Sequence, residues 1–197
     1  MKALVFWTLI NFIPGIILAA LISSSDSVNF KKKHPVTIQK GPLHFIIYSE
    51  KKMELHHLSG KLKEPLPDTV THLGRSYIIT SLGDNSMTKN FDLAQITLPD
   101  TITEIGRQAF YKSQTLTNVI LPANLKQIKS QAFSDCSQLR SIYFKSAVPP
   151  TLERGAFAPF GEELVFFYPE EYKANWPEML NGVPCYPWNP KKLPKNE

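Results

Sequence analysis

The sequence is poor in the residues from which catalytic, metal and disulfide sites are built. It has two cysteines, nine glycines and five histidines among 197 residues. There is no Cys-x-x-Cys pair, no His-x-x-x-His pair, no Gly-x-Ser-x-Gly motif and no glycine-rich phosphate loop. The aspartates at positions 84, 92, 100 and 135 lack the spacing of a calcium-binding loop. We therefore expect no enzyme activity, no metal ion and no cofactor.

Strong charge of one sign is also missing. The formal net charge is only +5, and the lysines are scattered through the chain and its tail. A modest positive balance of this kind usually serves solubility, whereas nucleic-acid binding needs a concentrated basic surface. We expect no nucleic-acid partner.

Only one long apolar run is present, and it lies at the beginning of the chain. Lys2 is followed by an almost uninterrupted apolar stretch to Ile22 and then by three serines. This order predicts a secretory signal peptide over residues 1–25. An uncleaved membrane anchor is the alternative, because about 20 apolar residues can span a bilayer. Contact with a membrane is expected only through residues 1–22, if that segment is retained.

One stretch of the remaining sequence is repeated. Residues 98–110 read LPDTITEIGRQAF, and residues 121–133 read LPANLKQIKSQAF, at an offset of 23 residues. Weaker copies precede and follow this pair. Aligned, the copies give columns of buried-type residues: Leu82, Ile105, Ile128 and Leu152; Met87, Phe110, Phe133 and Phe157; Ile96, Val119, Ile142 and Phe166; Leu98, Leu121, Phe144 and Tyr168.

A repeat this short cannot bury its own apolar face, so each copy must be covered by the next. The alternation at Ile96, Thr97 and Leu98 has the period of a strand, with one side chain pointing out between two pointing in. The Ala-Phe stretch of each copy is predicted to be a short helical or 3₁₀ turn. The copies therefore predict a solenoid in which the phenylalanines of successive coils lie in one line.

These residues resemble a known repeat. The pattern Leu-Pro-x-x-Ile-x-x-Ile-Gly-x-x-Ala-Phe is similar to the BspA-type leucine-rich repeat of secreted and surface proteins of gut and oral bacteria, and it covers residues 65–176. The resemblance implies an α/β repeat fold, a right-handed leucine-rich-repeat solenoid of about four 23–24-residue repeats. It also implies that an N-terminal β-hairpin cap and a short C-terminal helical cap cover the two ends.

The domain boundaries follow from these patterns. After the segment 1–25 we expect a flexible leader over 26–42 and an N-terminal β cap over 43–74, with a hairpin across 43–58. The leucine-rich repeats occupy 75–169, and a C-terminal cap with a proline-rich tail occupies 170–197. In that cap Tyr172 and Trp176 are predicted to share one helix face and to pack on the last coil.

The two cysteines have two interpretations. Cys136 falls at the repeat position that Ser113 holds in the preceding copy, which favours a small buried thiol. A disulfide with Cys185 is the alternative, since an exported protein meets an oxidising compartment.

The solenoid also predicts a surface. The middle residue of each strand points away from the core, which gives an outward column that becomes more apolar toward the C-terminus. The candidate partner-binding residues are Thr97, Ile120, Tyr143 and Phe167 in this column, with Gln95, Asn118 and Arg140 beside it. An exposed aromatic stripe often marks a binding surface. Cover by a tail carrying Tyr186 and Trp188, or ordinary strand surface, are the alternatives.

We therefore predict a non-catalytic, secreted or cell-surface binding module that presents a concave β-sheet to a protein or glycan partner in adhesion or a similar interaction. An envelope-anchored structural or self-associating spacer is the alternative. An enzyme with a site built from loops is a remote third.

Overall fold

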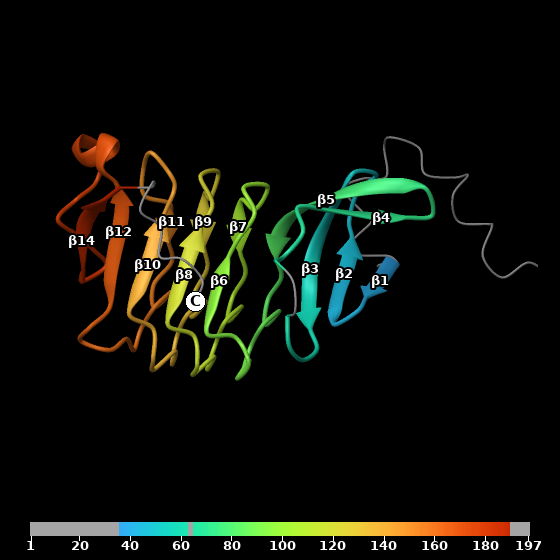
Figure 1. Cartoon of the computed structure of the whole chain (residues 1–197), viewed down its shortest axis with the longest axis horizontal. Helices are drawn as coiled ribbons and strands as arrows, with labels where there is room; N and C mark the ends of the chain where they lie inside the picture. The colour runs from blue at the N-terminus through green and yellow to red at the C-terminus, as the bar shows by residue number, and fades with distance from the viewer. Residues whose placement is uncertain (1–35, 63–64, 190–197) are drawn as a thin grey trace, which may run out of the picture.

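The computed structural model describes residues 36–62 and 65–189. The predicted signal peptide or anchor at 1–25 lies outside the described residues. After an antiparallel N-terminal part, the chain winds into coils that each contribute one short strand to each of two sheets, and the sheets lie in two layers with the core between them (Figure 1).

The larger sheet, called sheet A, contains eight strands. They are β1 (Val36–Lys40), β2 (Leu43–Ile47), β3 (Lys52–Leu58), β5 (Arg75–Leu82), β7 (Glu104–Ile105), β9 (Gln127–Ile128) and β11 (Thr151–Leu152), in this order, with β4 (Thr69–His72) paired to β5. The first three strands are antiparallel neighbours, whereas β3, β5, β7, β9 and β11 run parallel. Parallel pairing is what successive coils of a solenoid produce, since each coil repeats the direction of the last.

The second sheet, called sheet B, has six strands. They are β6 (Gln95–Thr97), β8 (Asn118–Leu121), β10 (Ser141–Phe144), β12 (Val165–Pro169), β14 (Val183–Trp188) and β13 (Met179–Leu180). Within this sheet β6, β8, β10, β12 and β14 are parallel neighbours in that order, and β13 pairs antiparallel with β14. Four coils thus contribute a strand to each sheet, and β14 and β13 extend sheet B beyond the fourth coil.

The core lies between the sheets and is built from the predicted columns. Phe110 stacks on Phe133 with ring centroids 4.8 Å apart, and Phe133 stacks on Phe157 at 5.1 Å. All three rings are buried, as is Met87 at the same position of the first coil. The prediction that these phenylalanines lie in one line is confirmed.

The prediction of helical turns at the Ala-Phe stretches is wrong, so the solenoid is a β-solenoid with almost no helix. Two positions in each of the first three stretches, and one in the fourth, have left-handed backbone. The first is held by Asn85, Gln108, Gln131 and Gly155, and the second by Lys89, Lys112 and Asp135, all with φ between 53° and 74°. A helix requires consecutive right-handed residues, so it cannot pass through these positions.

The stretches instead bond from coil to coil. The Phe110 N–H donates to the Ala132 carbonyl at 2.7 Å, and the Gln108 N–H donates to the Ser130 carbonyl at 3.2 Å. In the first three coils the turn backbone is thereby satisfied in part by the following coil and in part locally, as where the Tyr111 N–H donates to the Gln108 carbonyl at 3.1 Å.

The N-terminal part differs from prediction in one respect. The hairpin expected over 43–58 is present as β2 and β3, which pair antiparallel. The flexible leader was predicted to extend to residue 42, but Val36–Lys40 is strand β1 and pairs with β2. Ile38 of β1 is buried against the core, which gives this segment a reason to be ordered.

The C-terminal part differs more. The predicted helical cap is a single 3₁₀ segment, η1 (Glu170–Asn175), interrupted by non-helical backbone at Tyr172. Trp176 packs on the last coils as expected, stacking on Tyr168 at 5.3 Å and contacting Phe144 at 4.9 Å. The described part of the proline-rich tail is regular structure, because it forms β13 and β14.

Candidate binding surface

The outward column predicted from the sequence is present on sheet B and is longer than predicted. Cα partners across the parallel strands align Thr97, Ile120, Tyr143 and Phe167 in one row. Strand β14 continues the row, because Phe167 pairs with Tyr186. We call these five residues the outer column.

The C-terminal half of the outer column is aromatic. Tyr143 and Phe167 stack with centroids 4.8 Å apart and ring planes 12° apart. Tyr186 lies beside Phe167 at 6.4 Å with its ring tilted by 43°. Tyr186 is 50% exposed, whereas Tyr143 and Phe167 are partly buried. The end of the column therefore offers solvent an aromatic surface.

Trp188 completes this surface from the side. Its ring meets Tyr143 edge-on at 5.2 Å, and its indole N–H donates to the Phe144 carbonyl at 3.4 Å. Strand β14 pairs with β12, so the Trp188 side chain crosses β12 to reach β10. The alternative of cover by the tail is therefore realised in part: Trp188 buries one side of Tyr143, while Tyr186 stays exposed. We call Tyr143, Phe167, Tyr186 and Trp188 the aromatic patch.

The polar candidates lie in the neighbouring row or at the strand ends. Gln95 and Asn118 are aligned Cα partners and both are partly buried. The Asn118 side-chain amide donates to the Thr117 hydroxyl at 3.2 Å. Arg140 precedes β10 and forms an ion pair with Glu163 at 2.6 Å, so part of its charge is already neutralised. The structure thus brings six of the seven candidates onto one face of sheet B, with Arg140 just before the start of β10.

Of the alternatives left open by the sequence, cover of the column by the tail holds for Trp188, whereas Tyr186 is the fifth member of the column. The 23-residue period ends before β14, so no repeat position assigns these residues. Their aromatic character was the only available indication.

The cysteines offer no reactive group. Both are free thiols and both are buried, so the alternative of a Cys136–Cys185 disulfide is wrong. Burial raises the pKa of the Cys136 thiol to about 12 and that of Cys185 to about 11. The Cys136 thiol donates to the Phe110 carbonyl at 3.0 Å, and Ser113 donates to the Met87 carbonyl at 2.9 Å from the equivalent position. Cys136 is therefore a packing residue with a local hydrogen bond.

Within residues 36–62 and 65–189 no group of three or more histidine, cysteine or acidic side chains is close enough to hold a metal ion. Over the same part of the chain, no helix has the length and apolar character needed to cross a bilayer.

The repeats match a known family. The sequence-family model "BspA type Leucine rich repeat region" matches residues 69–164 in six copies. This chain is a BspA-type leucine-rich-repeat protein. The family model thus finds more copies than the four predicted from the sequence, and its match begins at Thr69, at the start of β4. Membership supports a repeat-based interaction module. No curated protein matches the chain.

Solved structures of leucine-rich-repeat proteins have the same fold. One from Bacteroides capillosus is 26% identical, with a TM-score of 0.60, and the match covers 67% of this chain and 97% of that one. A leucine-rich cell surface protein from Faecalibacterium prausnitzii is 23% identical with a TM-score of 0.53, over 71% of this chain and 46% of that one. A protein from Bacteroides ovatus is 22% identical with a TM-score of 0.54, over 68% of this chain and 38% of its own. The chain therefore matches less than half the length of the latter two.

Proposed function

We propose that this protein is a non-catalytic, exported binding module that holds a protein or glycan partner on the outer face of sheet B. The observation that carries the proposal is the aromatic patch, which continues the outer column at its C-terminal end. Aromatic rings grouped on a solvent-facing sheet are enriched at interfaces, because they bury a large area at little cost in conformational entropy.

Export is supported by two observations. Residues 1–25 have the charged start, apolar run and polar exit of a signal peptide. One similar structure is described as a leucine-rich cell surface protein. Secretion or attachment to the cell surface is therefore the proposed location, and N-terminal sequencing of the exported protein would distinguish the cleaved form from the anchored spacer.

Ring orientation favours a protein partner over a glycan. Tyr143 and Phe167 are stacked with nearly parallel planes, so their faces contact each other and their edges face outward. Sugar rings stack on exposed aromatic faces, and in the patch only Tyr186 is tilted and exposed enough to offer one. Apolar side chains of a protein can pack on ring edges and on Ile120 along the whole column.

The test replaces Tyr186, which is exposed, and Ile120, which is partly buried in the same column, and leaves the core intact. Ile120→Ser with Tyr186→Ser should weaken binding to immobilised extracellular-matrix proteins or cell-wall glycans by about tenfold or more, measured by biolayer interferometry. Tyr143 is unsuitable for this test, because Trp188 packs on it. Leu73→Ser is the matched control, since Leu73 is apolar, 80% exposed and lies in the turn between β4 and β5.

Two outcomes are decisive for this proposal. If the double variant and the control bind equally well, the face of sheet B is not the binding surface. Binding to glycans alone, lost with Tyr186→Ser alone, would identify a carbohydrate module in place of a protein-binding one.

A further inference from the structure

The two sheets end differently after the fourth coil. Sheet B continues through β14 and β13, whereas β11 (Thr151–Leu152) is the last strand of sheet A. The N–H groups of Thr151 and Glu153 donate to the preceding coil, at 2.8 Å and 2.9 Å. Backbone groups alternate in direction along a strand, so the N–H and carbonyl of Leu152 face the open end.

Two more donors, the N–H groups of Gly155 and Phe157, face the same end. In the third coil the equivalent groups are paired: the Gln131 N–H donates to the Gly155 carbonyl at 3.1 Å, and the Phe133 N–H donates to the Ala156 carbonyl at 2.7 Å. Gly155 and Phe157 occupy the same positions of the fourth coil. Among the described residues their N–H groups have no acceptor, because no fifth coil follows. Main-chain donors without a partner are rare in folded proteins and are costly when they are shielded from water.

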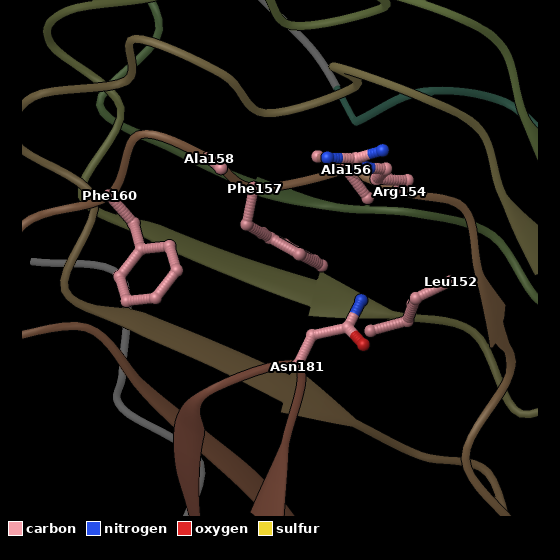
Figure 2. Close-up of a pocket in the computed structure, with 8 residues that line it drawn as sticks. Leu152, Arg154, Ala156, Phe157, Ala158, Phe160 and Asn181 are labelled. Atoms are coloured by element: carbon pink, nitrogen blue, oxygen red, sulfur yellow. The ribbon is translucent and has the colours of Figure 1, made fainter.

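A pocket of about 410 Å³ lies at this point. Leu152, Phe157 and Phe160 give it apolar walls, and Asn181 reaches it from the turn between β13 and β14 (Figure 2). Phe160 is 39% exposed and Phe157 is the last ring of the phenylalanine stack. If a fifth coil followed, its apolar side chains would extend the core columns that end at Leu152 and Phe157. The pocket lies at the place those side chains would fill.

The charge at the pocket is positive. Arg154 lines it and is exposed, and no acidic group of the described residues forms an ion pair with it. An exposed guanidinium beside an apolar pocket favours an occupant that carries a carboxylate next to its apolar side chain.

We infer that the open end of sheet A is a second binding site, separate from the outer column, and that it captures an extended peptide of a partner protein with an apolar side chain beside an acidic one. The peptide adds along β11 as a further strand. Its carbonyls accept from the Gly155 and Phe157 N–H groups, and its apolar side chain enters the pocket against Phe157 and Phe160. Addition of a strand to an unpaired edge is a general mode of peptide recognition.

The chain contains a segment whose sequence can serve as a test peptide for this site. Residues 103–110, with the sequence TEIGRQAF, are the equivalent segment of the second coil and include the Ile and Phe of both columns together with Glu104. The probe is this octapeptide with glutamate in place of its arginine (TEIGEQAF), because Arg107 holds the position of Arg154 and the glutamate then places a carboxylate beside that guanidinium; it is capped at both ends, labelled with a fluorophore and titrated with the full-length protein by fluorescence polarisation. A version with N-methyl groups on alternate residues keeps the side chains and removes strand pairing.

Matched variants of the protein test the walls and the charge. Arg154→Glu and Phe160→Ala should each weaken binding of the octapeptide by about tenfold. Arg107→Glu is the control, because Arg107 holds the position of Arg154 two coils earlier and is also exposed. The N-methylated peptide should not bind, and in the ¹⁵N-labelled protein the octapeptide should slow hydrogen exchange at the Gly155 and Phe157 amides.

Several results would overturn the inference. One is equal binding of the octapeptide by the Arg154→Glu and Arg107→Glu variants. Binding of the N-methylated peptide would also do so. Another is protection of the two amides in the free chain that is lost when residues 190–197 are removed, which would make the chain's own tail the occupant. The last is protection that appears only at high protein concentration, which would indicate a second copy. None of these depends on the variants at Ile120 and Tyr186, so the two proposals succeed or fail separately.

Discussion

Single residues in this solenoid are constrained mainly by how closely one coil lies on the next. Among the glycines of the described residues, Gly106 has the least room for a side chain. A Cβ atom built there would lie 2.6 Å from the Gly83 carbonyl carbon and 2.7 Å from the Asp84 nitrogen. Both are backbone atoms, which cannot move aside without displacing the first coil.

Gly106→Ala should therefore destabilise the protein. We expect a loss of about 2–3 kcal/mol in the free energy of unfolding, as for other overpacked positions, measured by urea denaturation. Gly161→Ala is the control, because nothing lies within 4 Å of a Cβ there. A change of less than about 0.5 kcal/mol at Gly106 would mean that the coils can separate slightly without cost.

The buried thiol of Cys136 makes stability depend on alkaline pH. Its pKa is raised by burial from 9.0 to about 12, so the folded state holds the proton more tightly than the unfolded state. The contribution is fully present below pH 9 and is lost as the pH rises toward 12. Cys136→Ser keeps the hydrogen-bonding geometry that Ser113 already shows, and it removes this ionisation.

We expect the Cys136→Ser variant to lose less stability between pH 8 and pH 11 than the parent protein does, by chemical denaturation at each pH. Iodoacetamide should label the parent at Cys136 only under unfolding conditions. Rapid labelling of the folded protein at pH 8 would contradict the burial of this thiol.

Strand β14 lies outside the repeat and is held by contacts that no repeat position specifies. It is held to β12 by parallel pairing, and its buried residues Val183 and Cys185 face the core. Trp188 fastens its C-terminal end, since it packs on Tyr143 and donates to the Phe144 carbonyl. An element beyond the last coil, such as β14, can open locally while the coils stay folded.

Trp188→Ala should release β14 first. Hydrogen exchange at the amides of β14 should accelerate by about tenfold or more, with the amides of β8 unchanged, as seen by ¹H–¹⁵N spectroscopy. Phe91→Ala serves as control, because Phe91 is a large apolar residue that is 57% exposed. Equal acceleration in β8 and β14 would show that Trp188 stabilises the whole fold.

At the scale of the whole molecule, the chain behaves as a row of units in which each coil touches its neighbours. Phe133 is the middle ring of the stack, between Phe110 and Phe157. Removing it weakens the interfaces on both sides of the third coil. Because stability in solenoids is approximately a sum over neighbouring interfaces, such a change can also divide one cooperative unit into two.

Phe133→Ala should cost about 3–5 kcal/mol, in the range for buried aromatic residues. Trp176 and Trp188 both lie at the C-terminal end, so their fluorescence reports that end alone once Trp7 is replaced by Phe. We expect the fluorescence transition to separate from the far-ultraviolet circular dichroism transition in the variant and to coincide with it in the parent. Coincident transitions in both would indicate a single cooperative unit.

The repeat period was sufficient to predict the core. Buried apolar positions recur with the coil, and stacking similar coils brings equivalent residues together, so the phenylalanine line and the first four residues of the outer column followed from the period and the strand alternation. The backbone of the turns did not follow. Gln108 and Lys112 adopt left-handed conformations because the next coil supplies their hydrogen-bond acceptors, and no local preference for that conformation is visible in a glutamine or a lysine.

The two ends were decided by tertiary structure. Strands β1 and β14 lie outside the repeat, and they are ordered because the first and last coils leave strand edges and apolar surface to be covered. A periodic pattern specifies only how one coil packs against the next coil of the same kind. What meets the last coil depends on contacts that no copy specifies, and so Tyr186, Trp188 and the open edge of β11 became apparent only in the folded chain.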